Sequence, residues 1–96
     1  MPIKIEIPGP LREQANGQNE VMVTGTTVGA ALADLVKQYP GLEPKLFLNG
    51  QLRQYINVFF RAPGFDADED IRYHDDMDTV LKDGMVVMVI PAVAGG

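Results

Sequence analysis

A run of six apolar residues over 85–90 most constrains the fold of this 96-residue chain. Uninterrupted apolar runs of this length, rich in β-branched side chains, are typical of strands that are buried on both faces of a sheet. Pro91 follows at once and lacks the N–H that a strand ladder needs. We therefore predict a central strand over 85–90 whose ladder ends near Pro91.

The N-terminal quarter predicts a pair of strands joined by a long connection. Isoleucines at every second position over 3–7 indicate a strand with one buried face, and a similar alternation recurs over about 20–24. Between them, residues 11–13 favour a short turn or helical piece, and Asn16-Gly17 is a strong turn signal.

An amphipathic helix is predicted over about 27–38. Thr26 or Thr27 can cap its N-terminus, and Pro40-Gly41 ends it. Its apolar residues recur at helical spacing, so one stripe would pack on the sheet. The fold class is α+β, with a small mixed sheet and one main helix on one face.

The segment between the helix and the last strand predicts weaker elements, because its apolar runs are short and turn residues interrupt them. In chain order, we expect a loosely structured apolar segment at 42–48, a third strand at 55–60, an exposed acidic loop at 61–70, a short strand at 71–73 and one helical turn at 77–81.

Composition excludes several classes of function. The chain has no cysteine and no serine, and His74 is its only histidine, which argues against disulfides, thiolate metal sites and the usual hydrolase nucleophiles. A net charge of -5 argues against nucleic acid as a partner. No apolar run approaches the roughly 20 residues of a membrane span, and the N-terminus does not resemble a signal peptide. We expect a cytoplasmic protein.

A metal site is not expected either. Asp66, Asp68 and Asp70 have calcium-loop spacing, but Ile71 and Met77 stand where such a loop needs glycine and glutamate. The glycines match no phosphate-binding or dinucleotide motif, so we expect no bound cofactor.

The chain ends in Gly95-Gly96. Without a Cβ, these residues can enter a channel that is too narrow for side chains, and the terminal carboxylate becomes the reactive group. Six residues follow Ile90, which gives a reach of about 20 Å when extended. A frayed end with incidental glycines is the alternative.

Several segments together resemble the ubiquitin-like β-grasp family, and more closely its sulfur-carrier branch, which includes molybdopterin synthase small subunits and thiamin sulfur carriers. The resemblance covers nearly the whole chain, and the ending is especially similar to the sulfur carrier of an actinobacterial cysteine-synthesis route. Residues 61–67 look inserted relative to the family. The matching segments are Gly25-Thr26-Thr27-Val28, Tyr39-Pro40-Gly41-Leu42, Ile56-Asn57-Val58, Leu81-Lys82-Asp83-Gly84 and residues 86–96.

The resemblance implies a single β-grasp domain over 1–96, with residues 91–96 as an extended reactive tail. It implies a carrier rather than an enzyme: a partner uses ATP to adenylate Gly96, and a sulfur donor then displaces AMP to leave a thiocarboxylate. The implied partners are this adenylating enzyme or sulfurtransferase, a downstream sulfur-accepting synthase, and a metalloprotease that releases product from the tail. The tail favours cysteine or molybdopterin biosynthesis. A protein modifier conjugated to lysines and a synthase subunit are the competing interpretations.

The last strand also predicts a docking surface. Because successive side chains of a strand point to opposite faces of the sheet, Val87 and Val89 share one face. By resemblance to ubiquitin, this is the face that the helix covers. The opposite set, with Phe59, would form an exposed apolar patch of the kind that marks interfaces, unless the central strand is covered on both faces. The predicted partner-binding residues are Phe59, Val86, Met88, Ile90, Pro91, Ala92, Val93 and Ala94, and the reactive residues are Gly95 and Gly96.

Overall fold

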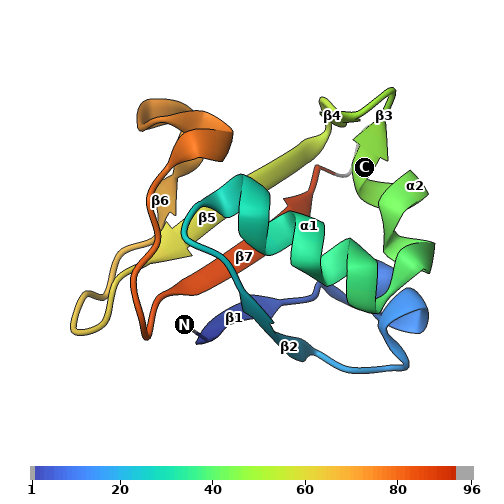
Figure 1. Cartoon of the computed structure of the whole chain (residues 1–96), viewed down its shortest axis with the longest axis horizontal. Coiled ribbons are helices and arrows are strands. Elements are labelled where there is room, and N and C mark those ends of the chain that lie inside the picture. The colour runs from blue at the N-terminus through green and yellow to red at the C-terminus, as the bar shows by residue number, and fades with distance from the viewer. Residues whose placement is uncertain (1, 93–96) are drawn as a thin grey trace.

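The computed structural model describes residues 2–92. Five strands form one mixed sheet, and helix α1 (Val28–Gln38) lies across one face of it (Figure 1). This arrangement confirms the predicted α+β class. In the order in which they lie across the sheet, the strands are β2 (Glu20–Thr24), β1 (Pro2–Glu6), β7 (Val86–Pro91), β5 (Ile56–Arg61) and β6 (Glu69–Asp70).

Strand β7 is central, as its apolar run predicts. It pairs in parallel with β1 and antiparallel with β5, and Val87 and Val89 are buried in the core. The ladder reaches slightly further than expected. Pro91 lies opposite Ile56, and the Ala92 N–H donates to the carbonyl oxygen of Tyr55 at 2.6 Å.

The N-terminal pair is also as predicted. Strands β1 and β2 are antiparallel, with Ile5 opposite Val21. The connection contains the 3-10 helix Gly9–Ala15, whose Leu11 and Ala15 are buried. It ends where Asn16 and Gly17 both adopt positive φ angles of 55° and 78°, a conformation that asparagine and glycine tolerate best.

Helix α1 is held to β2 at its side and capped at its start. The Thr27 side-chain oxygen accepts the Ala30 N–H at 3.1 Å, which selects Thr27 over Thr26 as the cap. Leu32 and Leu35 are fully buried against the sheet. The Thr24 N–H donates to Asp34 Oδ2 at 3.0 Å, and this bond lowers the pKa of the Asp34 carboxyl.

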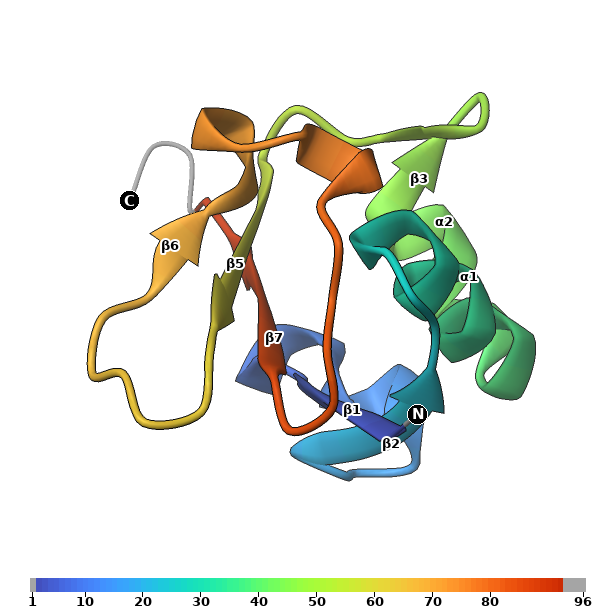
Figure 2. The same ribbon diagram turned by 60° about the vertical axis from the view of Figure 1, so that its left-hand side comes forward.

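The prediction of a loose segment at 42–48 is wrong. A 3-10 turn (Pro40–Leu42) leads into helix α2 (Glu43–Leu46), which is followed by the hairpin of β3 (Phe47–Leu48) and β4 (Gln51–Leu52). Leu42 and Leu46 are buried in the core and hold this segment against it. Figure 2 shows α1, α2 and β3 together on one side of the sheet.

The short strand predicted at 71–73 is also wrong. These residues form a 3-10 helix (Ile71–Tyr73), because Asp70 accepts the Arg72 N–H at 2.9 Å and so caps a helical turn. The short strand is β6, just before it. The helical turn expected at 77–81 lies slightly earlier, at Asp76–Asp78.

Most of the residues that join β5 to β6 are exposed, as predicted for the acidic loop. Within residues 2–92, no cluster of three or more potential ligand side chains is placed to hold a metal ion. In the same part of the chain, no helix combines the length and the apolar character needed to cross a bilayer.

The capping bond of α1 gives a test of the fold. Thr27→Ala should lower the free energy of unfolding by about 1 kcal/mol, because the Ala30 N–H loses its acceptor. Thr26→Ala is the matched control and should change it by less than about 0.5 kcal/mol, since that hydroxyl caps nothing. Urea unfolding measures both values. Equal losses would contradict the cap assignment.

Candidate functional site

The part of the chain that the structure describes ends beside Tyr55. Pro91 pairs with Ile56, and the Ala92 N–H then donates to the Tyr55 carbonyl, so the pairing with β5 continues to Ala92. Pro91 and Ala92, which we expected in the extended tail, are therefore part of the β5–β7 pairing. The remaining tail residues, Val93, Ala94, Gly95 and Gly96, lie outside the described residues, so their predicted roles stay predictions.

The sheet face away from α1 carries the other predicted docking residues. Met88 lies opposite Phe59 in the β5–β7 ladder, so the two side chains share this face. Val86 and Ile90, two positions away on either side, share it too. The structure therefore brings Phe59, Val86, Met88 and Ile90 together on the face that the helix leaves open.

The expected exposed patch is only partly present. Ile90 is 46% exposed, but Met88 is only 6% exposed, so the expected exposure of Met88 is wrong, while its role in partner binding stays a prediction. The reason lies in a charged bridge across the strand. Arg61 on β5 pairs with Glu6 on β1 at 3.7 Å, and β7 lies between these two strands, so the Arg61 side chain crosses β7.

Arg61 also pairs with Asp68 of the β5–β6 loop at 3.4 Å. Lys4 and Glu20 form a further pair on the same face at 3.7 Å. All these side chains are at least one-third exposed, and such pairs contribute about 0–1 kcal/mol each. The open face therefore has an ionic part over Val86 and Met88 and an apolar part at Ile90, next to the tail.

A shallow cavity of about 410 Å³ adjoins this apolar part. Its wall includes Met88 and Ile90 together with Arg12, Glu6, Glu20 and Asp68. Lys4 and Arg61 already pair with the three carboxylates, so the wall combines apolar side chains with charges of both signs.

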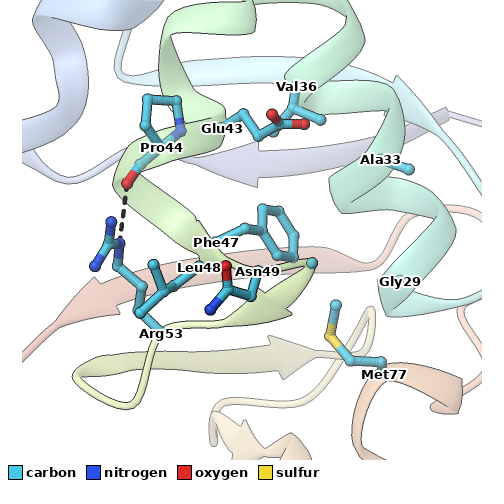
Figure 3. Close-up of a pocket in the computed structure, with 11 residues that line it drawn as sticks. Gly29, Ala33, Val36, Glu43, Pro44, Phe47, Leu48, Asn49, Arg53 and Met77 are labelled. Carbon is cyan, nitrogen blue, oxygen red and sulfur yellow. Dashed lines mark hydrogen bonds between the residues drawn. The ribbon is translucent and has the colours of Figure 1, made fainter.

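A second hollow, which we did not predict, lies on the helix side (Figure 3). It measures about 660 Å³ and lies between α1, α2 and the β3–β4 hairpin, with Val36, Phe47 and Met77 in its wall. Arg53 stands at one end, where its Nε donates to the Pro44 carbonyl at 2.9 Å. The apolar residues of 42–48 were the available signal, but their pattern favoured a loose segment.

Comparison with known proteins gives the family. The ThiS family matches residues 5–96. The chain belongs to this family.

One relative is the sulfur carrier protein CysO of Mycobacterium tuberculosis, 34% identical over 99 residues that cover both chains completely. Another is small archaeal modifier protein 3 of Haloferax volcanii, 36% identical over 70 residues, or 73% of this chain and 70% of the relative. A chain of the Amycolatopsis orientalis BexX/CysO complex superposes with a TM-score of 0.85 at 31% identity, covering 98% of this chain and 99% of the other.

These comparisons confirm the ubiquitin-like β-grasp fold predicted from the resemblance. Membership of the ThiS family, together with full-length similarity to a sulfur carrier, supports a sulfur-carrier role for this chain.

The difference in burial along β7 can be tested by two matched substitutions. Met88→Asp should lower the free energy of unfolding by at least about 2 kcal/mol, because it buries a carboxylate beside Glu6. Ile90→Asp should lower it by about 1 kcal/mol or less, since this side chain is half exposed. Chemical denaturation measures both. Similar losses for the two variants would show that Met88 is not buried.

Proposed function

We propose that this protein carries sulfur on its C-terminal carboxylate, which a partner enzyme adenylates and then converts to a thiocarboxylate. The observation that supports this most directly is the end of the β5–β7 ladder. Within residues 2–92, the last hydrogen bond to the sheet is made by Ala92, and the sequence after it is Val-Ala-Gly-Gly. The fold thus holds the base of a short segment that ends in the two smallest residues.

The proposed chemistry has two steps. A carboxylate oxygen of Gly96 attacks the α-phosphorus of ATP, and pyrophosphate leaves. Hydrosulfide then attacks the carbonyl carbon, the C–O bond to AMP breaks, and the S–H proton is lost to solvent, which leaves the thiocarboxylate. The carrier holds the reacting group in place and binds no cofactor itself, while ATP binds to the partner. Delivery of this group by a folded carrier lowers the entropic cost of bringing sulfur to an enclosed site.

The anchoring of Ala92 shortens the reach that we expected. Four residues follow it, and fully extended they span about 13–14 Å. The partner would enclose the tail in a channel, and its reactive centre would therefore lie within this distance of the channel's rim. Gly95 and Gly96 would occupy the narrowest part of the channel, where any side chain beyond hydrogen would collide with the wall.

The full-length similarity to the mycobacterial carrier favours sulfur delivery to cysteine biosynthesis, with molybdopterin biosynthesis as the second possible destination. The proposed partners are the adenylating enzyme, a sulfur-accepting synthase and a metalloprotease that frees the product. The Amycolatopsis complex supports partner proteins in general, since CysO is bound to BexX in it. Dependence on ATP is consistent with a reaction in the cytoplasm.

A second candidate function is protein modification, in which Gly96 forms an isopeptide bond with a lysine. The 36% identity to an archaeal modifier protein favours modification over the role of a synthase subunit. Sulfur transfer and modification share the adenylation step and differ in the nucleophile that follows.

Intact mass spectrometry distinguishes the two. The protein is incubated with its adenylating enzyme, ATP and a sulfide source, and we expect its mass to rise by the difference between sulfur and oxygen. Carrier activity requires this shift. Conjugates in a cell extract that resist reductant, without the shift in the purified reaction, would instead favour the modifier.

The terminal glycine gives a sharper prediction. Gly96→Ala should lower kcat/KM for adenylation at least about tenfold, or about 1.4 kcal/mol, because the added methyl group must enter the narrow channel. Thermal unfolding should be nearly unchanged. A protein with its α-carboxyl blocked as an amide is the control and should be inactive. Full activity of either protein would reject the proposed role of Gly96.

A further inference from the structure

A second exposed surface begins at Tyr55, whose carbonyl accepts the Ala92 N–H, and extends from there to the β3–β4 hairpin. It is formed by Leu48 of the β3–β4 hairpin with Arg53 and Tyr55, and we call these three residues the hairpin surface. Leu48 is 55% exposed and Tyr55 is 44% exposed. A shallow cavity of about 460 Å³ lies between them. Two large apolar side chains are therefore presented to solvent around one cation.

Arg53 is held firmly in this surface. Its backbone N–H donates to the Leu46 carbonyl at 2.8 Å, and its own carbonyl accepts the Ile56 N–H at 3.0 Å. Its side-chain Nε donates to the Pro44 carbonyl at 2.9 Å, as Figure 3 shows. The guanidinium carbon lies 6.0 Å from the centre of the Tyr55 ring. A side chain fixed in this way loses little further freedom when a partner binds it.

The charge of Arg53 is not paired with an acid within residues 2–92. Lys4, Arg61 and Arg72 each form an ion pair with a carboxylate in this part of the chain, whereas Arg53 bonds only to a backbone carbonyl. The chain as a whole carries a net charge of -5. Arg53 is thus a preorganised cation, with remaining N–H donors, in an acidic protein.

The position of this surface identifies its occupant. The Tyr55 carbonyl accepts the Ala92 N–H, so Tyr55 lies directly beside the last residue that the structure describes. A protein that encloses the residues after Ala92 must bring the rim of its channel against Tyr55 and its neighbours. The hairpin surface is therefore continuous with the contact that the tail itself requires.

We propose that the hairpin surface binds the rim of the adenylating enzyme's channel, which presents a carboxylate to Arg53 and an apolar side chain to Leu48 and Tyr55. This inference rests on the proposed function and adds a residue that positions the carrier. In this arrangement Arg53 meets the partner's rim and takes no part in the reaction of ATP with the terminal carboxylate. It should therefore act on the affinity between the two proteins and leave the chemical step unaltered.

The test measures ATP–pyrophosphate exchange by the purified adenylating enzyme of the same organism, with the full-length carrier as the varied substrate. Arg53→Glu should raise KM for the carrier at least about tenfold, because a partner carboxylate then faces a like charge, while kcat stays within about twofold. Lys82→Glu is the matched control. Lys82 is exposed in the turn before β7, at the opposite end of the strand from Ala92, and its variant should leave KM within about twofold.

A second variant separates charge from local structure. Arg53→Lys keeps the positive charge but removes the Nε bond to Pro44, so its KM should stay within about threefold of the original protein. Thermal unfolding of each variant identifies any loss of fold.

Three outcomes would overturn the proposal. The first is an unchanged KM for Arg53→Glu, and the second is an equal rise in KM for Arg53→Lys and Arg53→Glu. The third is an equal rise for Lys82→Glu, which would indicate a general charge effect. If the unaltered protein supports no ATP–pyrophosphate exchange at all, the proposed function itself is rejected. The proposed role of the hairpin surface is then rejected too.

Discussion

The antiparallel ladder between β5 and β7 is the interaction on which the rest of the structure depends. It runs over six residue pairs, from Arg61 opposite Val86 to Ile56 opposite Pro91. Because β7 also pairs with β1, this one strand joins the N-terminal hairpin to the second half of the chain. The same ladder buries Val58 and Val89 and fixes the position of Ala92. Core packing and the exit point of the tail are therefore set by one set of hydrogen bonds.

The two faces of β7 are covered in different ways. One face is closed by α1 and is part of a dry core, where Val87 is fully buried. The other is closed only by side chains that cross the strand, chiefly Arg61 on its way to Glu6. Partly exposed ion pairs contribute little stability, so a partner can displace them at small cost, while in the free protein they shield Met88 from water. The open face thus presents charged side chains to water in the free protein and retains apolar side chains that a partner can contact.

The sequence predicted the elements whose signals are local. The apolar run of β7, the alternation of β1 and the Thr27 cap each depend on neighbours within a few residues. The errors arose where distant contacts, or in one case a side-chain cap that the apolar pattern does not reveal, decide the outcome. Leu46 is buried because the core accepts it, although Pro44 interrupts any regular pattern around it. Residues 71–73 favour a strand by composition, but the Asp70 cap turns them into a helix. The burial of Met88 depends on Arg61, which lies 27 positions earlier, and no local pattern contains that contact.

The energetics of the tail explain why such a carrier needs a folded body. Fixing the backbone of four residues in a channel costs about 4–8 kcal/mol. Two of these residues are glycines, which lose the most freedom and have no side chains to bury. Burial of roughly 160–320 Å² of apolar surface elsewhere in the contact between carrier and partner must therefore offset this cost. The folded domain offers such an area, and the exposed apolar side chains shown next to Ala92 are Ile90 of the open face and Tyr55 of the hairpin surface. A glycine tail suited to a narrow channel thus requires docking surfaces around its base, and the β5–β7 ladder places Ile90 there, next to the bond between Ala92 and Tyr55.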